Sequence, residues 1–159
     1  MKSLSLNITY KALALDELSA ADRDLVMQAK QACRTSYAPY SRFCVGSAVR
    51  LEGGEVVCGS NQENAAFPSG TCAERCAMFY ANAHRPELAP ETIAIAACNQ
   101  QGRFTPMPIT PCGACRQVLI ETQKRYGRNL RIVLYGESVI YELGSVSDLL
   151  PFQFDADAL

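Results

Sequence analysis

The sequence predicts an α/β fold in which helices cover both faces of one mixed sheet, a three-layer sandwich. Segments with apolar residues at helical spacing alternate along the chain with segments of strand pattern. One near-continuous apolar run, residues 92–98, has the composition of a central strand buried on both faces. A chain of 159 residues is long enough to bury its own core, so a single domain over residues 1–159 is expected.

The N-terminal half supplies one strand pattern, one helix and one hairpin. Residues 3–13 alternate apolar and polar side chains, which predicts either an added edge strand or an arm onto a neighbouring subunit. Ser19, with an acidic residue three positions later, is typical of a helix start, and apolar residues continue at helical spacing to about residue 36. Residues 43–51 and 56–58 flank a Gly-Gly turn and predict a hairpin.

The C-terminal half continues with helices and strands in alternation. These are a helix over residues 72–83, the central strand 92–98, a surface loop over 99–110, a helix over 112–126, a hairpin over 130–135 and 138–142, and a short helix over 145–150.

Composition excludes several classes of partner. Fifteen basic against sixteen acidic residues give a net charge of −1, so we expect no nucleic-acid partner. No apolar run reaches the length of a membrane span, and the N-terminus lacks a signal-peptide pattern, so we expect a cytoplasmic protein with no membrane partner. In that setting the eight cysteines indicate reduced thiols, metal ligands or small buried hydrophobes.

Two segments concentrate metal-ligand chemistry at predicted helix starts. Cys72 begins the helix after a loop, and Cys112 and Cys115 lie one turn apart on the helix that follows Pro111. Helix N-termini stabilise thiolates, and three thiolates favour zinc. Three protein ligands leave a fourth position for water, and Glu74 is close enough in sequence to exchange a proton with that water. The pattern predicts a catalytic zinc site with Glu74 as proton carrier.

Two alternatives remain open on spacing alone. Cys76 lies one turn after Cys72, so four cysteines could form a closed structural zinc site without catalysis. The spacing of Cys112 and Cys115 also suits thiol–disulfide exchange, although that interpretation gives Cys72 and Glu74 no function.

Four motifs in the same order resemble the all-cysteine, homotetrameric branch of the cytidine deaminase family. They are YAPYSRFCVG at residues 37–46, NQENAAFP at 61–68, CAER at 72–75 and PCGACRQ at 111–117. The resemblance spans roughly residues 20–154 and leaves the N-terminal extension, residues 1–15, unexplained. It implies a five-stranded sheet with the two zinc helices side by side, and a homotetramer.

The resemblance also implies an activity, the zinc-dependent hydrolytic deamination of cytidine and 2′-deoxycytidine in pyrimidine salvage, with release of ammonia. The implied roles are zinc binding by Cys72, Cys112 and Cys115, proton transfer by Glu74, ribose binding by Asn61 and Glu63, base binding by Phe43 and the N–H of Ala73, and donation to the thiolates by Arg75, with Asn64 and Thr110 as weaker candidates.

Rival functions and departures from the family pattern also follow from the sequence. A deaminase of a related nucleoside-like compound, such as an aminoglycosyl-nucleoside antibiotic, is the nearest alternative, and an interaction module built on a structural four-cysteine zinc site is the non-enzymatic one. Phe67 stands where the family often has tyrosine. Phe152 and Phe154 are two candidates for the phenylalanine that closes a neighbouring active site in the family, and His84 is expected on the surface.

Overall fold

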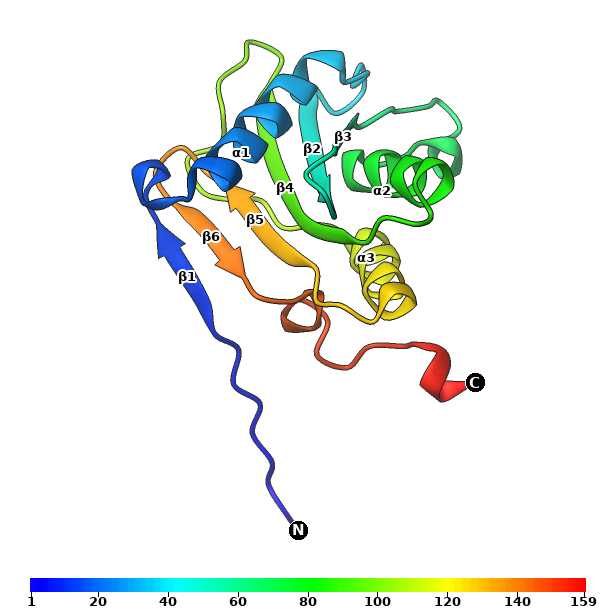
Figure 1. The fold of residues 1–159 in the computed structure, drawn as a ribbon. Coiled ribbons are helices and arrows are strands. Elements are labelled where there is room, and N and C mark those ends of the chain that lie inside the picture. Colours follow the sequence, from blue (N-terminus) through cyan, green and yellow to red (C-terminus); the bar gives the residue numbers. More distant parts are fainter.

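The computed structural model, which covers residues 1–159, is a sheet with helices on both faces (Figure 1). Helix α1 (Ala20–Ala32) packs on one face, and helices α2 (Ala73–His84) and α3 (Gly113–Tyr126) lie side by side on the other. This is the three-layer α/β sandwich that the order of elements predicts.

The sheet contains six strands in the order β1-β6-β5-β4-β2-β3. Their bounds are β1 Tyr10–Leu13, β2 Phe43–Leu51, β3 Val56–Ser60, β4 Pro90–Asn99, β5 Arg131–Tyr135 and β6 Ile140–Leu143. Strands β4 and β5 are parallel, and the other neighbours are antiparallel. Parallel neighbours need a crossover, which α3 provides between β4 and β5.

Successive side chains of β4 point to opposite faces of the sheet, so the core consists of two clusters. Ile93 and Ile95 belong to the cluster beneath α2 and α3, whereas Ala94 and Ala96 belong to the cluster beneath α1. Small side chains on the second face let α1 approach the sheet closely. Gly46 in β2 has the same effect, because a Cβ there would collide with the backbone of α1.

The sheet has one strand more than the resemblance implied, because β1 adds an edge. This is the edge strand that the pattern of residues 3–13 predicted, but it is shorter than that pattern. Tyr10 pairs with Leu143, the last residue of β6, so residues 3–9 run past the end of their neighbour and have no strand partner. Figure 1 shows this segment extending away from the body of the molecule.

Two segments that the sequence predicts as α-helical form 3₁₀ turns instead. After α1 the chain makes a 3₁₀ turn over Cys33–Thr35, and the predicted C-terminal helix is a 3₁₀ turn over Val146–Asp148. Ser19 caps α1 as predicted, and Ser145 caps the turn Val146–Asp148, because each side chain accepts a backbone N–H.

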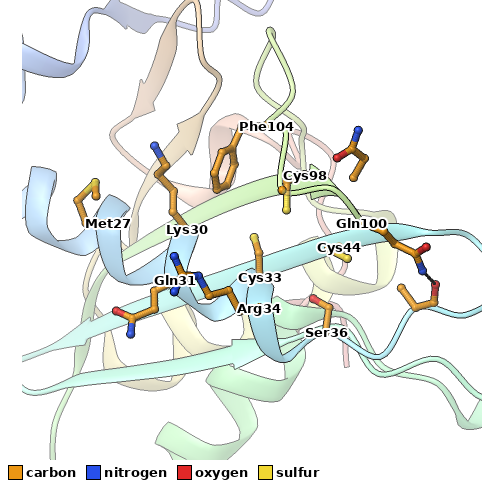
Figure 2. Close-up of a pocket in the computed structure, with 13 residues that line it drawn as sticks. Met27, Lys30, Gln31, Cys33, Arg34, Ser36, Cys44, Cys98, Gln100 and Phe104 are labelled. Carbon is orange, nitrogen blue, oxygen red and sulfur yellow. Dashed lines mark hydrogen bonds between the residues drawn. The ribbon is translucent and has the colours of Figure 1, made fainter.

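A cavity of about 770 Å³ opens beside the C-terminal end of α1, on the sheet face opposite α2 and α3 (Figure 2). Its walls include Cys33, Cys44 and Cys98, none of which the sequence assigned to a site. None of the helices is long and apolar enough to cross a bilayer.

Candidate active site

The two zinc-binding segments meet where α2 and α3 begin. Cys72 is the N-cap residue of α2 and Cys112 the N-cap residue of α3, so each stands one position before its helix. Cys115 lies in the first turn of α3 and is fully buried. N-terminal N–H groups lack partners within a helix, so both helices direct positive potential at this point.

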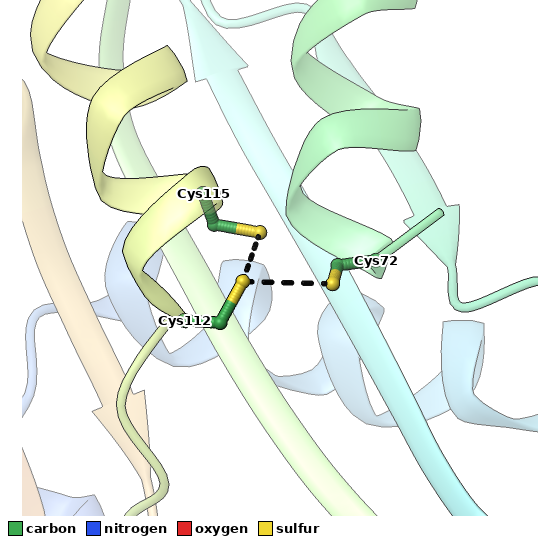
Figure 3. Close-up of side chains that lie close together, drawn as sticks. All are labelled: Cys72, Cys112 and Cys115. Carbon is green, nitrogen blue, oxygen red and sulfur yellow. Dashed lines mark hydrogen bonds between the residues drawn. The ribbon is translucent and has the colours of Figure 1, made fainter. Parts of the chain in front are cut away.

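The three sulfur atoms form a compact group (Figure 3). The Sγ of Cys112 lies 3.8 Å from that of Cys72 and 3.4 Å from that of Cys115, and all three lie within 4.8 Å of one another. Sulfurs bound to one tetrahedral zinc at about 2.3 Å would be roughly 3.8 Å apart. The cluster therefore fits zinc in donor type and in spacing.

The protonation of the cluster favours a cation. Hydrogen bonding from Cys115 lowers the pKa of Cys72 to about 5, burial opposes this shift, and Arg75 reinforces it. The same contact with Cys72, together with burial, raises the pKa of Cys115. Without metal, the cluster carries a thiolate at Cys72 at neutral pH.

Glu74 is a buried carboxyl beside this thiolate. Its side chain belongs to the second residue of α2, and the residue is only 4% exposed. Burial raises the pKa of Glu74, and the negative charge of Cys72 adds to the effect. A carboxyl whose pKa is raised is better suited both to accept and to return a proton, as general acid–base catalysis requires.

Arg75 places a cation against the sulfur cluster. Its Nη2 lies 3.9 Å from the Sγ of Cys72, and its Nε is buried without a partner. A guanidinium that donates to thiolates offsets part of their negative charge.

A pocket of about 240 Å³ connects Cys72 and Arg75 to the chain that follows β3. Asn61, Glu63 and Asn64 line it, together with Tyr40 and Phe67. Of the predicted zinc ligands, Cys72 alone borders this depression, beside the predicted sugar residues Asn61 and Glu63, while the larger cavity beside α1 lies away from them. Phe43, Ala73 and Thr110 are not in this lining.

The two predicted sugar ligands also hold the backbone beside Phe43. The Asn61 amide accepts from the N–H of Val45 at 2.8 Å and donates to the carbonyl of Phe43 at 2.9 Å. Oε2 of Glu63 accepts from the N–H of Tyr40 at 2.9 Å, and contacts with Ser41 lower the pKa of Glu63. These bonds fix the start of β2, where Phe43 is 38% exposed.

Cys76 does not join the sulfur cluster. It faces β3, where Gly59 allows the start of α2 to come close, and burial raises the pKa of its thiol. The closed four-cysteine site, and the interaction module built on it, is therefore not formed.

Two residues beside the site escaped the sequence interpretation. Tyr40 lines the pocket, and the side chain of Arg116 reaches back to the loop before Cys112. Their signals were an aromatic residue within YAPYS and an arginine directly after a ligand, and neither pattern alone indicates its contact.

Three cysteines that could hold zinc, a buried carboxyl and an adjoining pocket are the features of a zinc-dependent hydrolytic enzyme. Comparison with known proteins identifies the family. A family model for the cytidine and deoxycytidylate deaminase zinc-binding region matches residues 19–126. The chain belongs to this deaminase family.

Relatives agree along most of the chain. A cytidine deaminase of Halalkalibacterium halodurans is 40% identical over 137 residues, which span 84% of this chain and 93% of the relative. The crystal structure of the Burkholderia pseudomallei cytidine deaminase has a TM-score of 0.69 and 40% identity, covering 82% of this chain and 97% of that one. The Mycobacterium tuberculosis enzyme has a TM-score of 0.64 and 30% identity, covering 86% and 99% respectively.

Proposed function

We propose that this enzyme converts cytidine and 2′-deoxycytidine to uridine and 2′-deoxyuridine, consuming one water and releasing ammonia. The observation that carries the proposal is the meeting of Cys72, Cys112 and Cys115 beside the buried carboxyl of Glu74. The relatives named cytidine deaminase support the substrate, and they do not favour the antibiotic-nucleoside alternative.

In this proposal the three cysteines hold zinc, Glu74 transfers protons, and other residues bind the base. Zinc in such a site supplies Lewis acidity that lowers the pKa of bound water toward neutrality. Glu74 takes a proton from the attacking water and delivers it to the ring nitrogen next to C4. It then takes a second proton, from the hydroxyl that the water has left on C4, and delivers it to the amino group, which departs as ammonia. Its burial suits this role, because a raised pKa helps the carboxyl to hold each proton until it is delivered.

Substrate binding is assigned to groups around the pocket. The N–H of Ala73, at the start of α2 without a helical partner, would donate to the pyrimidine carbonyl. Phe43, which is 38% exposed, would contact the base. Glu63 retains its Oε1 for a sugar hydroxyl, while Asn61 would have to share its backbone bonds with the sugar.

We further propose a homotetramer that acts in the cytoplasm in pyrimidine salvage. Exposed aromatic side chains on α2 and in the C-terminal tail support subunit contacts, since Phe79 is 52% and Phe152 is 95% exposed. Eight free cysteines suit a reducing compartment. Light scattering should give four times the chain mass, and a monomeric mass would refute the assembly.

The first test is an assay combined with metal analysis. Cytidine absorbance should fall while ammonia appears, and the purified protein should contain one zinc per chain. Glu74→Gln should retain zinc and fold but lose turnover by roughly 10²–10⁴-fold, because the amide cannot carry the proton. Glu87→Gln, at an exposed position after α2, is the matched control. Full turnover in Glu74→Gln would refute the assigned role.

A further inference from the structure

Among the three sulfur ligands, Cys112 is the one least supported by packing. Cys115 is fully buried and Cys72 is half-buried, whereas Cys112 is exposed and precedes α3. Its position therefore depends on the loop that leads into α3 through Thr110 and Pro111.

The Arg116 side chain forms hydrogen bonds with that loop. Its Nε donates to the carbonyl of Pro111 at 2.9 Å, and its Nη2 donates to the hydroxyl of Thr110 at 3.1 Å. The backbone N–H of Arg116 also donates to the carbonyl of Cys112 at 2.9 Å. One residue thus contacts three consecutive residues that end at the exposed ligand.

A third side-chain hydrogen bond connects Arg116 to another part of the chain. Nη1 of Arg116 donates to the carbonyl of Leu149 at 2.9 Å. That carbonyl follows the turn Val146–Asp148, whose first residue is fully buried in the core beneath α2 and α3. The loop before Cys112 is therefore tied, through Arg116, to a fixed point 33 residues further along.

We propose that Arg116 is a positioning residue for the zinc site, which acts through Pro111 to hold the Cys112 sulfur toward the other two. The inference rests on the proposed zinc ligands. It assigns Arg116 neither a contact with zinc nor one with substrate. The planar guanidinium suits the task, because three of its donors reach three oxygens in different directions, whereas a lysine ammonium acts as a point donor.

The expected consequence is faster loss of zinc. Groups that orient metal ligands typically change metal affinity by about 10–100-fold when they are removed. In Arg116→Gln we expect zinc to transfer to a chromogenic chelator at least about tenfold faster than in the unaltered enzyme. Arg116→Lys keeps the charge but loses the fork, and it should release zinc nearly as fast as Arg116→Gln.

Arg23 offers a matched control. It also uses its guanidinium to donate to three backbone carbonyls, those of Leu15, Asp16 and Leu18, at 3.1 to 3.3 Å, but on the α1 side of the sheet. Arg23→Gln should lower the melting temperature without accelerating zinc release. Release rates and melting temperatures are measured on the same zinc-loaded samples, so a general loss of stability is separated from a local effect on Cys112.

Each outcome decides the question. Zinc release from Arg116→Gln at the unaltered rate, or equal acceleration by Arg23→Gln, would overturn the inference. Zinc release from Arg116→Lys at the rate of the unaltered enzyme would also overturn it, since the positive charge alone would then be enough to hold the loop. If Arg116→Gln does not fold, Thr110→Val removes only the hydrogen bond between Arg116 and the Thr110 hydroxyl, and it should still accelerate zinc release. Absence of zinc from the unaltered protein would instead refute the proposed function.

Discussion

Two groups of three cysteines lie on opposite faces of the same sheet and differ in their surroundings. The zinc-site cysteines, Cys72, Cys112 and Cys115, meet at the N-terminal ends of two helices. The α1-side cysteines, Cys33, Cys44 and Cys98, line the cavity shown in Figure 2, where Cys33 stands at the C-terminal end of α1.

The difference in location has an electrostatic consequence. Burial, reinforced by Cys98, raises the pKa of Cys33 to about 12, whereas the pKa of Cys72 is lowered to about 5. A helix C-terminus disfavours a negative sulfur and an N-terminus favours it. The number of cysteines does not make a metal site. Their placement relative to helix ends and to a cation such as Arg75 does.

The largest effect that tests this comparison is loss of the metal. Cys115→Ser removes a buried ligand, so zinc content should fall from one per chain to nearly none, and turnover should fall with it. Cys98→Ser makes the same chemical change at a site that is 5% exposed, and it should leave zinc content unchanged. Metal analysis of both proteins decides the matter, and loss of zinc from Cys98→Ser would remove the distinction between the two groups.

The zinc site was the more predictable of the two regions. Its three cysteines are recognised by residue type and by spacing within two segments, and apolar periodicity predicted α2, α3 and the central strand. The length of β1 was not predictable, because it depends on where β6 ends. The bond between Arg116 and Leu149 was equally hidden, since it joins residues 33 positions apart.

The backbone roles of Asn61 and Glu63 also lay beyond the sequence. They depend on the turn before β2, where the N–H groups of Tyr40 and Ser41 donate to Glu63 and the next residue, Arg42, adopts a positive φ of 56°. A left-handed arginine leaves no pattern in the sequence. The family resemblance implied that these side chains bind the ribose, whereas their backbone partners became visible only in the fold.

The effect of intermediate size concerns an ion-pair cluster on the α1 side of the sheet, and it should appear as a lower free energy of unfolding. Asp22 is buried there and pairs with Arg50 at 2.8 Å and with Arg131 at 3.0 Å. Asp22→Asn leaves two arginines without this partner. We expect the free energy of unfolding to fall by about 2–4 kcal/mol, below the upper range for buried pairs because Arg131 is 35% exposed. Turnover of the folded, zinc-loaded enzyme should not change.

The same residue predicts a pH dependence. Burial alone would raise the pKa of Asp22, but hydrogen bonds from Arg131, Arg50 and Ser19 outweigh it and hold the pKa below its ordinary value. The ion pairs therefore contribute fully above about pH 4, and their contribution is lost as the pH falls through the lowered pKa.

Urea unfolding of zinc-free protein at pH 7 and below pH 4 measures this contribution. The difference between the unaltered protein and Asp22→Asn should shrink at the lower pH. Asp24→Asn, whose carboxylate is exposed and accepts from Gln28, is the control. A difference that stays constant with pH would show that the lost contribution does not come from ionised Asp22.

The smallest effect is expected at Cys33, and it tests the α1-side cysteines most directly. Cys33 is 4% exposed, and its Sγ lies 3.4 Å from the carbonyl oxygen of Ala96. Cys33→Ala removes one buried sulfur and a weak donor, so the free energy of unfolding should fall by about 1 kcal/mol. Because its raised pKa keeps the thiol protonated at neutral pH, Cys33 in the folded, unaltered protein should also resist alkylation by iodoacetamide.

Zinc content and turnover of Cys33→Ala should equal those of the unaltered enzyme. Mass spectrometry of the alkylated protein and denaturant unfolding of the variant provide the two measurements. Rapid alkylation at Cys33 would mean that its environment stabilises a thiolate after all. Both groups of cysteines would then be chemically competent, and the contrast between helix N-termini and the C-terminal end of α1 would not account for which group binds metal.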